Sequence, residues 1–85
     1  MTEIIWDPQA REFLQKLPKE LSKRIFLKVD DQIRTNVEHY LETLTNIDCY
    51  KIRVGDYRLF VDYDQEGDKL RILTIKHRRN AYKSH

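Results

Sequence analysis

The sequence predicts an α+β domain in which an N-terminal strand and a two-helix hairpin precede a three-stranded antiparallel meander. Two patterns of apolar residues support this prediction. Up to about residue 35, apolar residues recur every three or four positions, as in helices that bury one stripe. From residue 49 onward they alternate with polar residues, as in strands with one buried face. The helices are expected to pack on one face of the sheet.

The chain is short, with 85 residues, of which 40% are hydrophobic and 35% are charged. This length supports one hydrophobic core, so residues 1–85 are expected to form a single domain, and two-domain enzymes and barrels are excluded. There is no signal-peptide pattern and no run of eighteen apolar residues. We therefore expect a cytoplasmic protein with no membrane partner. The single cysteine, Cys49, allows no internal disulfide.

The first half of the chain supplies the strand and the helices. Residues 2–6 are a short β-prone run that ends at Asp7 and Pro8, where the aspartate can cap a helix and the proline can take its first position. Pro18 ends this helix. The second helix carries an apolar residue at every fourth position, namely Leu21, Ile25, Val29 and Ile33. The apolar residues within 35–48 could extend the helix, but two Thr-Asn pairs favour a break, so we expect an irregular segment.

The second half supplies the meander. Gly55 and Asp56 are expected to form a two-residue turn between two alternating runs. This turn pairs Val54 with Tyr57, Arg53 with Arg58, Ile52 with Leu59, Lys51 with Phe60 and Tyr50 with Val61. A second turn at residues 64–67 is expected to place Val61 opposite Leu70, Leu59 opposite Ile72, Tyr57 opposite Thr74, Asp62 opposite Lys69 and Phe60 opposite Arg71.

The predicted hairpin brings Lys51, Arg53 and Arg58 together on the face that points away from the core. Arginines directly opposite each other repel, so folding alone does not favour this arrangement, and removal of Arg58 is expected to leave stability unchanged or raised. A bound phosphate or carboxylate would turn the repulsion into charge-assisted hydrogen bonds. The alternative is a solvated face with splayed arginines. Phe60 and Tyr82 favour nucleic acid, because exposed rings between cations can stack on bases.

The charge is distributed unevenly along the chain. Residues 1–48 carry 7 basic and 9 acidic residues, a net −2, and residues 49–85 carry 9 and 5, a net +4. After Asp68 all the charged residues are basic, which indicates a surface for a polyanion or an acidic partner, or simply a solvated tail. Strand alternation allows His77 either to approach the basic face or to take an adjacent structural role. The sequence has no glycine-rich phosphate loop, metal-binding histidine pair or nucleophile triad, so no cofactor or metal is expected.

Two stretches resemble the RelE/ParE superfamily of toxins from toxin–antitoxin pairs. They are Asp48-Cys-Tyr-Lys-Ile-Arg-Val-Gly-Asp-Tyr-Arg-Leu59 and Ile75-Lys-His-Arg-Arg-Asn-Ala-Tyr82. The RelE branch of that superfamily cuts messenger RNA in the ribosomal A site. The resemblance therefore implies an endoribonuclease that inhibits translation, with mRNA, the ribosome and a small RelB-like antitoxin as its partners.

Carried over by position, the family's catalytic residues correspond to Lys51, Arg53, Arg58, Arg78 and Tyr82. Cleavage would proceed by attack of the 2′-hydroxyl on its own phosphate. Of the four cations, Lys51 is the one that can act as a base, because a guanidinium is effectively never neutral. Further RNA contacts are expected from the surrounding basic and aromatic residues, namely Phe60, Arg71, Lys76, His77, Arg79 and Lys83. The alternative is a ParE-like toxin that binds DNA gyrase and does no chemistry.

Overall fold

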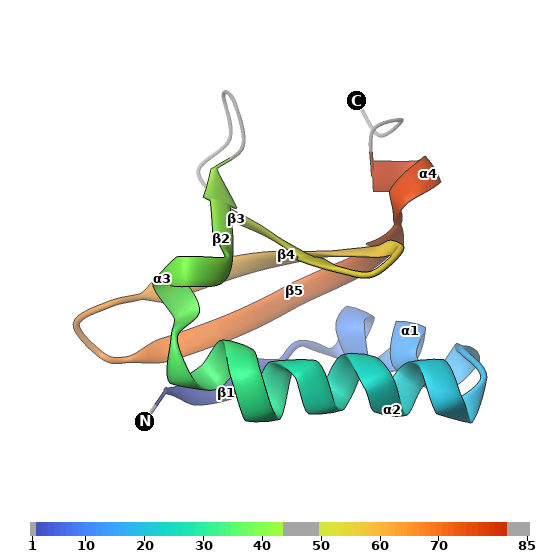
Figure 1. Cartoon of the computed structure of the whole chain (residues 1–85), viewed down its shortest axis with the longest axis horizontal. Coiled ribbons are helices and arrows are strands. Elements are labelled where there is room, and N and C mark those ends of the chain that lie inside the picture. The colour runs from blue at the N-terminus through green and yellow to red at the C-terminus, as the bar shows by residue number, and fades with distance from the viewer. Residues whose placement is uncertain (1, 44–49, 82–85) are drawn as a thin grey trace.

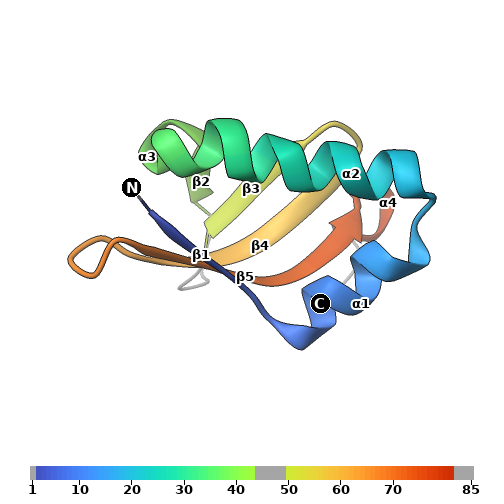
Figure 2. The same ribbon diagram turned by 90° about the horizontal axis from the view of Figure 1, so that it is seen from below.

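A five-stranded sheet with helices on one of its sides forms the fold (Figures 1 and 2). The computed structural model describes residues 2–43 and 50–81, so Cys49, Tyr82 and Lys83 lie outside the described residues. The strand order is β1 (Glu3–Trp6), β5 (Lys69–His77), β4 (Tyr57–Asp64), β3 (Tyr50–Val54) and β2 (Leu41–Thr43). β1 runs parallel to β5, and the other neighbours are antiparallel. The predicted α+β class is confirmed.

The two prolines separate the first helices as predicted. Pro8 takes the first position of α1 (Pro8–Lys16), and Pro18 precedes α2 (Lys19–Leu27). Asp7 stands at the N-cap position of α1, but its side chain makes no cap hydrogen bond. Its Oδ1 instead lies 3.8 Å from Nη1 of Arg71. Asp7 therefore connects the start of α1 to β5 and does not cap the helix through its side chain.

The apolar stripe of the second helix continues beyond α2. Residues at every fourth position would drift by about 40° per repeat around a regular α-helix, which has 3.6 residues per turn. The chain corrects this drift with a wider π-type turn at Lys28–Gln32, followed by a 3-10 turn at Ile33–Thr35. Ile25, Val29 and Ile33 are consequently all buried against the sheet.

The expectation that residues 35–48 are irregular is wrong for the part of this segment that the structure describes. Val37–Tyr40 form a one-turn helix, α3, and β2 follows at once and pairs antiparallel with β3. Each element is shorter than the window in which a period can be recognised, so the sequence pattern does not reveal it. β2 adds Glu42 to the sheet, directly opposite Lys51.

The β3–β4 register is confirmed at every pair, from Val54 opposite Tyr57 to Tyr50 opposite Val61. Gly55, the first of the two turn residues, has φ +57°. Glycine adopts this left-handed conformation without the steric cost that a Cβ brings. The turn residue therefore fixes the pairing of the cationic strands.

The β4–β5 register differs from the prediction. The turn comprises residues 65–68, Val61 pairs with Ile72, and Asp62 pairs with Arg71. The register then shifts, because Phe60 pairs with Thr74 and leaves Leu73 as an extra residue on β5. Such a bulge reverses the alternation of the following residues. From Thr74 onward, each side chain of β5 therefore lies on the face opposite to the one that simple alternation assigns to it.

The core lies between the helices and the inner face of the sheet. Its buried members are Ala10, Ile25, Val29, Ile33, Val37, Ile52, Val54, Leu59, Val61, Leu70, Ile72 and Ile75. They come from both layers, so the helices and the sheet depend on each other for burial. Among the described residues, no helix is both long and apolar enough to cross a membrane.

We expect Gly55→Ala to lower the free energy of unfolding by about 1–2 kcal/mol, because an L-residue pays this cost in the left-handed region. The cost is conformational, since a Cβ at this position would meet no atom within 4 Å. Gly55→Asn is the matched control and should cost less, because asparagine tolerates this region better. Urea unfolding of the three proteins measures the difference, and equal stability of all three would contradict the role of the turn.

Candidate functional site

Three cations stand side by side on the face of the sheet that points away from the helices. Arg53 of β3 pairs with Arg58 of β4, and Arg58 pairs with Lys76 of β5. We call these three residues the cationic row. The residues next to them along the strands, Ile52, Leu59 and Ile75, are buried in the core. Strand alternation therefore directs the row to the opposite face. Like charges in direct cross-strand pairs are unfavourable.

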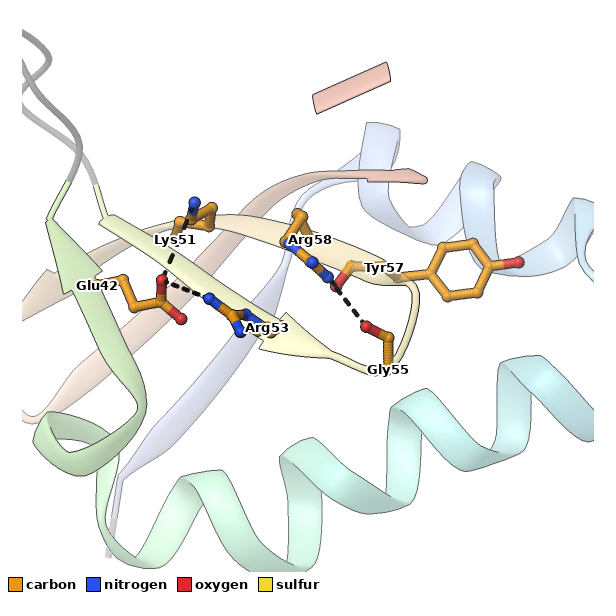
Figure 3. Close-up of polar contacts among 6 residues, drawn as sticks. All are labelled: Glu42, Lys51, Arg53, Gly55, Tyr57 and Arg58. Atoms are coloured by element: carbon orange, nitrogen blue, oxygen red, sulfur yellow. Dashed lines mark hydrogen bonds and ion pairs between the residues drawn. The ribbon is translucent and has the colours of Figure 1, made fainter. Parts of the chain in front are cut away.

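A carboxylate from the edge strand relieves one end of the row. Oε1 of Glu42 lies 3.4 Å from Nη2 of Arg53 and 3.9 Å from Nζ of Lys51 (Figure 3). Exposure differs between the two cations, since 12% of the Lys51 side chain is accessible and 58% of that of Arg53. One acidic group thus contacts two of the cations that the sequence predicts to act together.

Arg58 is not a splayed surface arginine. It is only 7% exposed, and its Nη1 donates to the carbonyl oxygens of Gly55 at 2.9 Å and Tyr57 at 3.0 Å. Figure 3 shows its side chain turned toward the β3–β4 turn. Its Nε is buried and has no hydrogen-bond partner within the described part of the chain. The expectation that Arg58 is held against its local preference is therefore wrong in the main, although one donor remains unsatisfied.

The third member of the row carries an aromatic contact. Nζ of Lys76 lies 6.0 Å from the ring centroid of Phe60. Phe60 pairs with Lys51 on one side and with Thr74 on the other. The predicted neighbourhood of Lys51, Arg53, Arg58 and Phe60 therefore exists as one continuous surface, and the bulge adds Lys76 to it.

The basic C-terminal segment follows β5 at the end of the sheet where the β3–β4 turn lies. α4 (Arg78–Ala81) follows β5 and projects away from α1 and α2 (Figure 1). The N–H of Arg78 donates to the carbonyl oxygen of Asp56 at 2.7 Å, and Nε of Arg78 lies 3.8 Å from Oδ1 of Asp56. Both Arg78 and Arg79 are exposed. The β3–β4 turn thus holds Arg78 close to the end of the cationic row.

Two predicted contacts are placed elsewhere, that of Arg71 by the position of the β4–β5 turn and that of His77 by the bulge. Arg71 lies opposite Asp62 and near Asp7, and not opposite Phe60. His77 pairs with Tyr57 on the core face, where the two rings meet edge to face at 5.4 Å. Neither residue belongs to the cationic row. Tyr82 and Lys83 lie outside the described residues.

Sequence reasoning missed Glu42 and the role of Asp56. The alternation of Leu41, Glu42 and Thr43 is a strand signal, but three residues are too few to distinguish it from the surrounding loop. Asp56 is read from sequence only as a turn residue, because its contact with Arg78 spans 22 positions of the chain. Within the described ranges, no group of three or more His, Cys, Asp or Glu side chains is arranged to hold a metal ion.

A separate hollow of about 430 Å³ lies near the start of β1 and is lined in part by Thr2, Arg34, Glu38, Tyr63 and Asp68. Burial, followed by the carboxylates of Asp68 and Glu38, raises the pKa of the Tyr63 hydroxyl above its ordinary value of 10.0. Tyr63 therefore remains neutral at physiological pH. Its side chain is directed to the helix-covered half of the molecule, so the hollow is distinct from the cationic row.

Comparisons with solved structures agree on the fold. The toxin–antitoxin complex RelBE2 of Mycobacterium tuberculosis matches with a TM-score of 0.83 and 22% identity, over 89% of this chain and 96% of that chain. The RelE–RelB complex of Pyrococcus horikoshii matches with a TM-score of 0.68 and 28% identity, over 91% and 94%. The YoeB–YefM complex of Staphylococcus aureus gives 0.65 and 23%, over 91% and 97%. No curated protein sequence matches.

A family model also matches the sequence itself. It describes the ParE toxin of the type II toxin–antitoxin system parDE, and it covers residues 4–82. This range includes α1 and α2, the strands apart from Glu3 at the start of β1, and the arginines Arg78 and Arg79 after β5. The chain therefore belongs to the ParE toxin family within the RelE/ParE superfamily, and it is a toxin of a type II toxin–antitoxin system.

Proposed function

We propose that this toxin is an endoribonuclease that cuts messenger RNA on the ribosome. The observation that carries the proposal is the cationic row, because Arg53, Arg58 and Lys76 stand in direct cross-strand pairs on the face that the helices leave open. Turn carbonyls and Glu42 hold Arg58 and Arg53 in place, and the positive charge of the row suits the negative charge of an RNA phosphate. Phe60 beside it offers a ring on which a base can stack.

The reaction proposed is an internal transfer at one phosphate. The 2′-oxygen forms a bond to phosphorus, the bond from phosphorus to the 5′-oxygen of the next nucleotide breaks, and a 2′,3′-cyclic phosphate and a 5′-hydroxyl result. The cationic row would stabilise the charge that develops on the phosphate oxygens. Arg78 is proposed to donate a hydrogen bond to the leaving 5′-oxygen, which takes its proton from solvent water, and Tyr82 is proposed to position a base.

Two groups on this face are able to accept the proton of the 2′-hydroxyl, the amine of Lys51 and the carboxylate of Glu42. Lys51→Arg keeps the charge and removes a possible base, and Glu42→Gln removes the other while keeping the shape. Whichever of these two substitutions removes the actual base is expected to lower the single-turnover cleavage rate by about 10²-fold or more. A near-normal rate in both variants would exclude both residues from proton transfer.

The test of the function is a translation reaction with purified toxin, followed by primer extension on the message. We expect cuts at defined codons, and we expect cleavage to depend on the ribosome. A site with few acid–base groups cleaves faster when the ribosome orients the RNA in it. An intact message at concentrations that stop growth would refute the nuclease. Arg53→Ala is the matched control for the purified toxin. It removes one cation of the row and should reduce cleavage, and it leaves the core intact because Arg53 is largely exposed.

The second candidate function is binding of DNA gyrase without catalysis. It is favoured by one specific observation, namely that the matching family model is that of the ParE toxin. The sequence resemblance to the RelE branch favours the nuclease instead, because all five catalytic positions are filled. The same purified toxin separates the two, since an intact message together with altered DNA supercoiling supports the gyrase function.

An antitoxin is the proposed partner, as in the RelE–RelB and YoeB–YefM complexes that match this fold. An apolar hollow of about 540 Å³ lies between α1 and α2, and Lys19 and Lys23 stand on its border. Nearby, Phe26 is 44% and Leu27 is 41% exposed. An amphipathic, acidic segment of an antitoxin fits this combination of apolar surface and positive charge.

A further inference from the structure

His77 lies on the core face, where its side chain contacts the start of α4. It is the last residue of β5 and stands directly before Arg78, the first residue of α4. This is the N-cap position, whose side chain can accept a hydrogen bond from the second or third helical N–H. Nδ1 of His77 accepts such a bond from the backbone N–H of Arg79, at 3.2 Å.

The two first N–H groups of α4 are both satisfied by this arrangement. The N–H of Arg78 donates to the carbonyl oxygen of Asp56 in the β3–β4 turn, and that of Arg79 donates to His77. A helix leaves its first N–H groups without partners of its own, so these two acceptors fix where α4 begins. The position of Arg78 therefore depends on the carbonyl oxygen and the carboxylate of Asp56 and on one imidazole nitrogen.

An imidazole nitrogen accepts a hydrogen bond only when it carries no proton. The contact with Arg79 requires the neutral ring with its proton on Nε2. Imidazolium has an N–H on both nitrogens and cannot accept. A proton on Nδ1 therefore breaks the contact with Arg79.

The groups around His77 hold the ring in place. From β4, the ring of Tyr57 meets it edge to face, with an interplanar angle of 87°. From α1, Phe13 packs against Tyr57 at a centroid distance of 5.9 Å. The charged groups of the turn and of the adjacent chain are Asp56, which is engaged by Arg78, and the cations Lys76, Arg78 and Arg79. A proton on His77 would add a positive charge next to three cations in the chain. The one carboxylate of the turn, that of Asp56, is already paired with Arg78.

We propose that His77 is a positioning residue, a neutral cap that acts with Asp56 to hold α4 and Arg78 against the β3–β4 turn and that loosens the start of α4 on acidification. The link to RNA cleavage rests on the proposed function, whereas the cap itself does not. Histidine is suited to this task because its charge changes between about pH 5 and pH 8.

The cap is tested by NMR on the purified toxin without RNA. At pH 8 we expect the imidazole ¹⁵N shifts of His77 to show the proton on Nε2, and the Arg79 amide to be protected from exchange. At pH 5.5 its protection factor should fall about fivefold or more, as for the loss of a typical cap. The Nδ1–H tautomer at pH 8, or an unchanged protection factor, would overturn the proposal.

His77→Asn separates the cap from the titration, because asparagine is a good N-cap and does not change charge in this range. We expect the Arg79 amide of this variant to be equally protected at both pH values. His39→Asn is the matched control, since His39 is an exposed histidine in ring contact with Tyr40, and it should behave like the parent. A variant at His77 that keeps the parent's pH dependence would refute the assignment.

Cleavage assays at the same pH values test the link to Arg78. We expect the ratio of rates at pH 8 and pH 5.5 to be larger in the parent than in His77→Asn. Equal ratios in the two proteins would show that the cap does not position Arg78 for catalysis. If no protein cuts RNA at any pH, the proposed function fails, and the NMR result alone decides whether His77 is the cap.

Discussion

Arg58→Ala is expected to lower both the free energy of unfolding and the rate of RNA cleavage. The buried guanidinium donates to two turn carbonyls, Gly55 and Tyr57. Removing a charged donor from buried acceptors costs about 1–3 kcal/mol. Cleavage should fall at least ~10²-fold, because the middle cation of the row is lost. Urea unfolding and primer extension measure the two effects.

Arg53→Ala is the matched control for this prediction. Arg53 contacts Glu42 at 3.4 Å on an exposed surface, and such ion pairs contribute only about 0–1 kcal/mol. Its removal should therefore reduce cleavage while nearly preserving stability. An Arg58→Ala protein as stable as the parent would show that the turn contacts contribute nothing, and an unchanged cleavage rate would remove Arg58 from the proposed site.

Leu59→Ala is expected to lower the free energy of unfolding by about 2–5 kcal/mol, which is the range for a large-to-small change at a buried site. Leu59 is fully buried and pairs with Ile52 and Ile75 at the centre of the sheet. A loss of this size is a large fraction of the stability of a small domain. Growth inhibition should disappear with the fold.

Leu27→Ala is the control for Leu59. Leu27 is 41% exposed, and surface substitutions away from special features usually change stability by less than about 0.5 kcal/mol. Urea midpoints of the two variants should therefore differ clearly. Similar midpoints would mean that the core is not centred on Leu59.

The elements that could be predicted are those whose signal is local. The β3–β4 register follows from a two-residue turn at Gly55 and Asp56 and from strict alternation on both sides of it, and it is confirmed. The helix boundaries follow from Pro8 and Pro18. In each case a single residue type has a strong conformational preference, so no distant contact is needed to make the prediction.

The features that could not be predicted depend on contacts made in three dimensions. Leu73 is an ordinary strand residue in the sequence, and only pairing with β4 makes it the extra residue of a bulge. That bulge places Lys76 beside Arg58 and turns His77 to the core face. Glu42 likewise meets Lys51 and Arg53 only because β2 pairs with β3. The cluster of Lys51, Arg53 and Arg58 was therefore predictable, but the addition of Lys76 and the pairing with Glu42 were not.

The parallel pairing of β1 with β5 has a consequence for synthesis of the toxin. Glu3 lies opposite Lys69, and Oγ1 of Thr2 donates to Asp68 across 66 positions of the chain. At about 5–20 residues per second, the first strand waits for roughly 3–13 seconds before its neighbour leaves the ribosome. Contacts of such high sequence separation form late in folding. The nascent toxin would thus complete its sheet only after β5 has emerged, which gives an antitoxin time to meet it.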